Sequence, residues 1–239
     1  MAAREGYARD GLETRGVLMS STPLRKVTVW DAPTRLFHWS LVLLIAAAYL
    51  TAEFGLIDWH FRAGYAIIAL LLFRLAWGFV GSDTARFSRF LQNPLKAIQH
   101  LAHFTRREPD TEIGHNAAGG WMVLVLLALL LIQVGTGLFS NDQVFSEGPL
   151  AKYVGSAMSD RLTGLHELNF NLILIAVILH VLAVMAYALV KRHDLVRPMV
   201  TGWKRLPESM PAPRMANAGL AVVLFAVAAG IAWFISTLG

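Results

Sequence analysis

Long apolar stretches alternate with short polar ones along most of this chain, and the alternation predicts membrane-spanning helices. A helix needs about 20 mostly apolar residues to cross a bilayer, and the backbone of an open sheet could not be satisfied there. Five stretches meet this criterion: Leu36–Ala52, His60–Val80, Ala117–Leu138, His166–Val190 and Ala218–Ile235. The pattern therefore predicts an all-α integral membrane protein. It has a four-helix bundle within residues 36–205, then a linker and an accessory fifth helix within 206–239.

Composition supports the membrane class and narrows the chemistry. The 239 residues are 56% hydrophobic and 15% charged, which is too apolar for a soluble domain. No cysteine is present, so iron–sulfur clusters, thiolate zinc sites, disulfides and covalent c-type haem are excluded. The net charge is +5. The placement of the basic residues in the connections between spans explains this charge better than nucleic-acid binding does, so we expect no nucleic-acid partner.

The Lys and Arg residues predict the orientation of the spans. The segment 1–35 has six, and the connections 53–59, 82–116, 139–165 and 191–217 have none, five, two and six in turn. Basic connections stay in the cytoplasm, so the N-terminus is expected inside and the C-terminus outside. Residues 1–35 are expected to form a mostly disordered cytoplasmic tail, and the first span lies too far from the start for a signal peptide.

Two histidines in the fourth span raise the question of a cofactor. His166 and His180 are fourteen residues apart, a rise of about 21 Å and close to four full helical turns. They therefore share one face, with His166 near the outer surface and His180 near the cytoplasm. His60 opens the second span at the outer level, and His38 opens the first span at the inner level.

Two depth-matched histidine pairs predict two stacked haems. Each iron needs two imidazoles from facing helices, and the topology allows His60 with His166 outside and His38 with His180 inside. The alternative is that these histidines only pack or form hydrogen bonds. A zinc or copper site is less well supported, because no carboxylate or thiol joins either pair. His100, His103 and His193 are interpreted as solvated interfacial residues.

Four further residues are candidates for cofactor contacts. Arg74 lies on the face of His60 at the inner level and suits a haem propionate. Arg35, three residues before His38, could serve in the same way, although both arginines could instead reach the lipid headgroups. Gly64 follows His60 by four residues, where a missing side chain lets a flat porphyrin approach. His115 could be a rival ligand, a propionate partner, part of a quinone pocket or an interfacial histidine.

The motifs and their order resemble the bacterial cytochrome b561 family, which includes the b-type cytochrome subunit of membrane-bound Ni,Fe-hydrogenases. The similarity rests on "VWDAPTRLFHW", "HFRAGYAIIALLLFRLAWGFVGS", "GHNAAGGWM" and "LHELNFNLILIAVILHV" and covers about residues 27–205. It implies a four-helix core in a bacterial inner membrane with two b haems, ligated from the first, second and fourth helices by His38, His60, His166 and His180. The fifth span and the long N-terminal tail depart from this core.

The leading functional hypothesis is transmembrane electron transfer between membrane quinone and a redox partner, such as a periplasmic cytochrome c or a hydrogenase-like module. Whether the chain is an electron carrier or a subunit of a quinone-linked oxidoreductase stays open. The quinone could react inside near His115, or outside near the loop 139–165, which also offers a contact for a partner and in which Pro149–Arg161 could form a short surface helix. Two other classes are a histidine-lined proton or solute transporter and a membrane anchor subunit of a redox enzyme. A transporter would favour broken helices near the midplane, and an anchor needs no layered histidines.

Overall fold

The computed structural model describes residues 23–102, 110–144 and 146–239. Five of its helices are long and apolar enough to cross a membrane: α1 (Ala32–Glu53), α2 (Ile57–Val80), α5 (Ala117–Gly137), α6 (Ser156–Ala186) with the π-helical turn η2 (Tyr187–Lys191), and α8 (Ala218–Ser236). The predicted all-α membrane class and all five spans are therefore confirmed.

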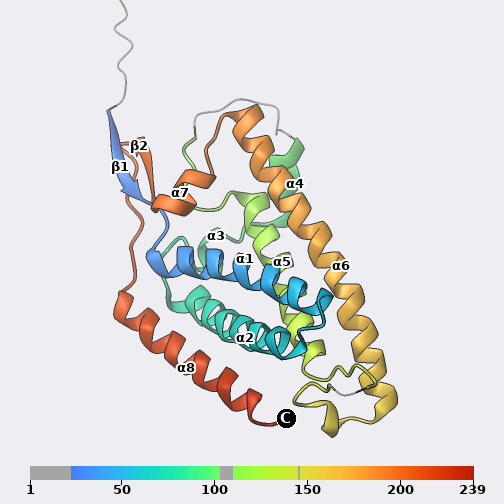
Figure 1. The fold of residues 1–239 in the computed structure, drawn as a ribbon. Helices are drawn as coiled ribbons and strands as arrows, with labels where there is room; N and C mark the ends of the chain where they lie inside the picture. Colours follow the sequence, from blue (N-terminus) through green and yellow to red (C-terminus); the bar gives the residue numbers. More distant parts are fainter. Residues whose placement is uncertain (1–22, 103–109, 145) are drawn as a thin grey trace, which may run out of the picture.

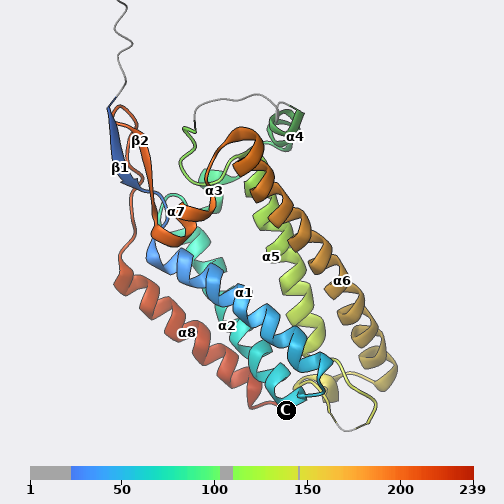
Figure 2. The same cartoon turned by 45° about the horizontal axis from the view of Figure 1, so that its top comes forward.

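Short elements connect these helices. They are β1 (Leu24–Thr28), α3 (Phe87–Phe90), α4 (Pro94–Ala102), the 3₁₀ turn η1 (Ala151–Tyr153), α7 (Val196–Thr201) and β2 (Trp203–Pro207). The strands, α3, α4 and α7 lie at one end of the bundle, which we call the basic end (Figure 1). The turn between α1 and α2 and the loop before α6 lie at the opposite end (Figure 2).

The central helix of the bundle is α2. It packs against α1, α8 and α5, and α6 packs mainly against α5, so that α8, α2, α5 and α6 follow one another across the molecule (Figure 2). The main core is apolar and includes Leu71, Trp77 and Ile173, each almost fully buried. Side chains on the outer faces of α6 and α8 are mostly exposed, as expected for helices that face lipid.

Side-chain caps explain where three of the spans begin. The Asp31 carboxylate accepts a hydrogen bond from the Thr34 backbone N–H (2.7 Å), and Asn116 and Asn217 cap α5 and α8 in the same way. Asp and Asn are favoured at this position because their oxygen satisfies a free N–H of the first turn. Asp31 also accepts a hydrogen bond from the Trp77 indole (3.1 Å) and so joins α1 to α2.

A two-stranded antiparallel sheet joins the segment before α1 to the segment after α6. Leu24 pairs with Pro207 and Thr28 with Trp203, and Val27 and Leu206 are buried in a small core with Val29 and Trp30. Part of the region predicted to be a disordered tail is therefore ordered, because its alternating apolar residues find a partner strand far along the chain. Residues 1–22 lie outside the described part.

Two other expectations about the chain are refined. The fourth spanning helix begins ten residues earlier than predicted, because Ser156–Leu165 continues α6 beyond its apolar part. The prediction of a separate surface helix over Pro149–Arg161 is therefore wrong: this segment forms the short turn η1 and then the start of α6.

The fifth span, α8, packs closely on α2 through Ala221, Ala228 and Ala232, small residues that let two helices approach.

Candidate functional site

One histidine pair lies at the opposite end of the bundle. His60, from the first turn of α2, and His166, from α6, have ring centroids 6.1 Å apart with planes at 80°. Two imidazoles that share one metal ion have their centres about 6 Å apart, since each metal–nitrogen bond is about 2 Å long. The sequence-predicted partners are thus brought together, at a spacing that suits a single iron.

The hydrogen bonds of this pair leave the same nitrogen of each ring available. The Nδ1–H of His60 donates to the carbonyl oxygen of Ala48 (2.9 Å), and that of His166 donates to the carbonyl oxygen of Gln133 (2.9 Å). A carbonyl only accepts, so each Nδ1 carries the proton and each Nε2 keeps its lone pair. Histidines that bind metals are oriented in this way.

The helix α5 shapes the space around His166. A Cβ at Gly137 would lie 2.9 Å from Cε1 of His166, so a side chain there would displace the ring. Asn169, one turn after His166 and almost fully buried, donates to the Gln133 side chain (2.7 Å) and to the Leu129 carbonyl (2.9 Å). Sequence reasoning missed Gln133 and Asn169, although a buried amide one turn after a histidine is a usable signal.

The second pair lies at the basic end. His38, from α1, and His180, from α6, are close enough for their charges to interact. The Nδ1 atom of His38 is buried without a hydrogen-bond partner in the described residues. The depth prediction is consistent with this arrangement, because α6 carries one histidine of each pair at the two ends of the bundle.

Buried polar atoms without a partner gather around this second pair. Within the described residues they belong to six side chains, all at the basic end: Thr34, Arg35, His38, Arg74, Thr84 and His115. An unsatisfied buried polar atom costs about 1–3 kcal/mol, and more when it is charged. The guanidinium of Arg74, 3% exposed, is the most costly of these, and a bound anionic group would satisfy it.

His115 belongs to the same cluster. Its ring lies against Trp30 and Phe90, with centroids 4.7 and 4.8 Å away. Burial, with smaller contributions from the charges of Arg74, His180 and His38, lowers its pKa to about 3. His115 is therefore neutral at physiological pH, and it lies close enough to Arg74, His38 and His180 for their charges to act on it.

The remaining candidates differ in their surroundings. Arg35 donates from Nη1 to the carbonyl oxygen of Val200 (2.6 Å), so it ties α1 to α7, and only its Nε is unpartnered. Gly64 has open space where a Cβ would stand: apart from its chain neighbours and its own helix backbone, no atom of the described residues lies within 4 Å. His103 lies outside the described residues.

The donor set fits a haem. Paired imidazoles, open space beside Gly64 and a buried guanidinium with one unpartnered nitrogen are the chemistry that a porphyrin with two carboxylates needs. No solved structure matches this chain. The model of the family described as prokaryotic cytochrome b561 matches residues 29–202.

The chain belongs to this family.

Cytochrome b561 membership makes this chain a multi-pass membrane protein of the b-type cytochromes, which transfer electrons through haem b. The match ends before α8, so the fifth span lies outside the family core. It includes all four ligand candidates, as well as Arg35, Gly64, Arg74 and His115.

Curated relatives carry the name of a probable Ni/Fe-hydrogenase B-type cytochrome subunit. That of Azotobacter vinelandii is 27% identical, and the alignment covers 77% of this chain and 91% of the relative. That of Rhodobacter capsulatus is 26% identical, covering 83% and 88%. The hydrogenase 1 subunit of Escherichia coli K12 is also 26% identical, covering 74% and 89%.

Proposed function

We propose that the chain is a dihaem cytochrome that carries electrons across the bacterial inner membrane, between membrane quinone and a redox enzyme. One b haem is held by His60 and His166 and the other by His38 and His180. The observation that carries this proposal is the 6.1 Å spacing of the first pair, with both Nδ1 atoms engaged by carbonyls. The haems supply one-electron chemistry, and the protein holds and tunes them.

The two sites are joined by one rigid element. Because His166 and His180 lie on the same face of α6, their backbones are separated by about 21 Å along the helix axis. With one haem held at each end of this helix, electrons would pass between two fixed sites and would need no moving carrier. Two imidazoles from the protein would hold each iron and would leave no open position for oxygen.

The protein tunes the site at the basic end through charge. Arg74 places a buried positive charge near His38 and His180, which favours the more reduced, less positive state of a cofactor there. His115 is neutral and adds a hydrogen-bonding nitrogen without a second charge. Basic connections at this end favour a cytoplasmic location for it, with the C-terminus in the periplasm.

The partner is proposed from the relatives and from the opposite end of the bundle. The relatives are named as hydrogenase cytochrome subunits, so a redox enzyme that delivers or takes electrons is the partner we propose. Phe54, Leu56 and Trp59 are each more than half exposed in the turn that leads to His60. This turn offers apolar contact area close to the outer haem site.

Spectroscopy and turnover of the full chain test the proposal. Protein purified from haem-replete cells should contain two non-covalent b haems per chain by pyridine haemochrome. After reduction with dithionite, it should be reoxidised by a water-soluble quinone such as decylubiquinone. A colourless preparation would exclude the cytochrome function and favour a transporter or an anchor. A haem-replete protein that no quinone reoxidises would exclude the quinone part alone.

A further inference from the structure

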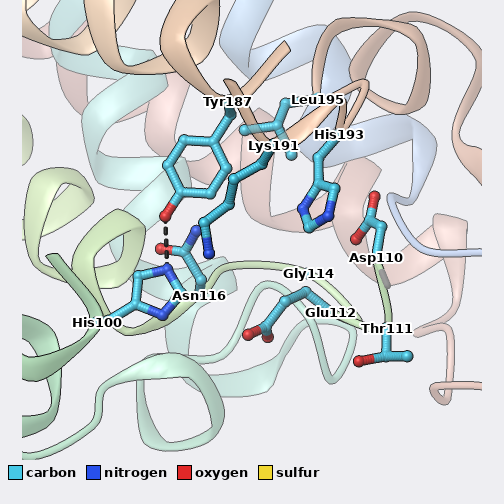
Figure 3. Close-up of a pocket in the computed structure, with 10 residues that line it drawn as sticks. All are labelled: His100, Asp110, Thr111, Glu112, Gly114, Asn116, Tyr187, Lys191, His193 and Leu195. Atoms are coloured by element: carbon cyan, nitrogen blue, oxygen red, sulfur yellow. Dashed lines mark hydrogen bonds between the residues drawn. The ribbon is translucent and has the colours of Figure 1, made fainter. Parts of the chain in front are cut away.

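A polar pocket at the basic end lies outside the two histidine pairs. It is a space of about 450 Å³ that opens to solvent, between α4, the segment 110–116 and the end of α6. Figure 3 shows its titratable side chains pointing into a common space. His193, interpreted from the sequence as a solvated histidine, is only 9% exposed here, because the chain folds back over the pocket after α6.

The end of α6 is wound in a way that aims two side chains into this pocket. Residues Tyr187–Lys191 form a π-helical turn, which Arg192 closes in the left-handed conformation with φ of 58°. Such turns are rare and occur often at functional sites. Tyr187 and Lys191 are each 7% exposed, so both side chains of the turn are buried. Burying a lysine and a tyrosine at the end of a membrane helix costs free energy, so such residues indicate a functional site.

These side chains form a connected polar cluster. The Tyr187 hydroxyl and His100 Nε2 share a hydrogen bond of 2.5 Å, and Lys191 Nζ lies 5.9 Å from the centre of the Tyr187 ring. Figure 3 shows Lys191 extending along Tyr187 toward Asn116. On the far wall, Asp110 is paired with Lys204 (2.8 Å), and Glu112 is exposed to water.

The cluster lies on the same face of α6 as His180, which belongs to the histidine pair of the basic end. Tyr187 follows His180 by seven residues, which places the two residues on one face of α6, about 10 Å apart along the axis. Asn116, which lines the pocket, directly follows His115, whose pKa responds to the charges of His38 and His180. The pocket therefore lies between water at the basic end and the surroundings of this pair.

We propose that this pocket is the proton-exchange site for the haem at His38 and His180, with His100 as the group that takes up the proton and Tyr187 as the residue that positions it. An electron added inside a low-dielectric bundle is stabilised by a positive charge gained nearby. For each electron that arrives from the redox partner, one proton leaves water at the basic end and converts neutral His100 to imidazolium. Among the described residues, the charged or titratable groups that line the pocket with His100 and Tyr187 are Lys191, Glu112, His193 and Asp110, which is paired with Lys204.

This inference rests on the proposed function for the presence of the haem, but its test needs no quinone. The full chain, purified with its haems, is titrated optically with redox mediators at pH 6, 7 and 8. In wild-type protein, the midpoint potential of one haem should fall as pH rises, since reduction is linked to proton uptake. His100→Gln should flatten this dependence. Tyr187→Phe, which keeps the ring and removes the hydroxyl, should move the pH at which it bends.

Tyr49→Phe is the matched control. The Tyr49 ring stacks on the Phe170 ring with centroids 5.3 Å apart, away from the pocket. Tyr49→Phe also removes a hydroxyl, and the pH dependence of the midpoint potential should stay as in wild type. Haem content is measured in every variant, so that loss of a haem is distinguished from loss of coupling. Equal pH dependence in wild-type and His100→Gln protein, or none in wild type, would overturn the inference while the cytochrome function stands. Wild-type protein without haem would overturn both.

Discussion

His60 and His166 face each other from α2 and α6 with their ring centroids 6.1 Å apart, and each ring is held by a backbone carbonyl at its Nδ1. The carbonyls belong to Ala48 on α1 and Gln133 on α5. Four helices therefore orient one pair of imidazoles. This arrangement leads to predictions about the ligands, the space around them and the charges near them.

Loss of haem from histidine variants should follow the two proposed histidine pairs. His60→Ala and His166→Ala should each remove the same haem, with the same spectral component lost, and His38→Ala and His180→Ala should each remove the other. Replacing either imidazole leaves an iron with one protein ligand, so the expected content falls from about two haems to about one per chain. Pyridine haemochrome and low-temperature difference spectra measure this.

Asn171→Ala is the control for these four variants, because Asn171 lies between His166 and His180 and bonds only to the Glu167 carbonyl within its own helix. It should keep both haems. If His60→Ala and His166→Ala removed different haems, the proposed pairing would be wrong.

A methyl group at Gly64 should obstruct haem binding even though no protein atom is near it. Alanine is better than glycine in a helix by about 0.5–1 kcal/mol, so the protein without haem should become slightly more stable. With haem, Gly64→Ala should weaken retention of the haem at His60 and His166. Gly230 on α8 also has open space where a Cβ would stand. Gly230→Ala should change the stability of the protein by a similar amount and should leave haem retention unchanged.

Removing the Arg74 charge should change the redox potential of one haem. Arg74→Leu should lower the midpoint potential of the haem at His38 and His180, because a positive charge no longer stabilises the reduced state. The effect is on the order of 1–2 kcal/mol for charges about 8–16 Å apart at an effective dielectric constant of about 20. Arg62→Leu, an exposed position on the same helix, should leave that potential unchanged in the same optical titration.

Acid should destabilise the protein through His115. Its pKa is about 3 in the folded chain and about 6.5 in an unfolded one, so only the unfolded chain binds the proton between these values. Stability is therefore full above pH 6.5 and falls as pH drops toward 3, by up to about 1.4 kcal/mol per pH unit. Unfolding temperatures at pH 7.5 and 5 should differ less in His115→Phe than in wild type. An equal difference would contradict this account.

Asp31 should contribute more stability than an ordinary cap. Asp31→Ala removes the cap of α1 and leaves the Trp77 indole N–H buried without its acceptor, a loss of about 2–4 kcal/mol in all. Asn217→Ala removes only the cap of α8, about 1 kcal/mol. Denaturant or thermal unfolding of both variants should show the larger loss for Asp31→Ala.

The spans and the approach of His60 to His166 could be predicted from the sequence, because both follow from local hydropathy and helical period. The start of α6 could not, since Asp160 and Arg161 break the apolar pattern although the helix continues through them. The hydrogen-bond acceptors of His60 and His166 could not be predicted either, because a backbone carbonyl from Ala48 or Gln133 has no side-chain signature. The pocket at His100 needs residues from three separate segments to meet, and no local pattern encodes that meeting.

The pairing of β1 with β2 has a consequence for biogenesis. β1 is synthesised before the first span, whereas its partner strand, Trp203–Pro207, leaves the ribosome only after all of α6. A nascent chain that stops short of residue 203 has His38 and His180 in the bilayer but lacks the strand that anchors the start of α1. The basic end of the bundle is therefore completed only after this strand has been translated.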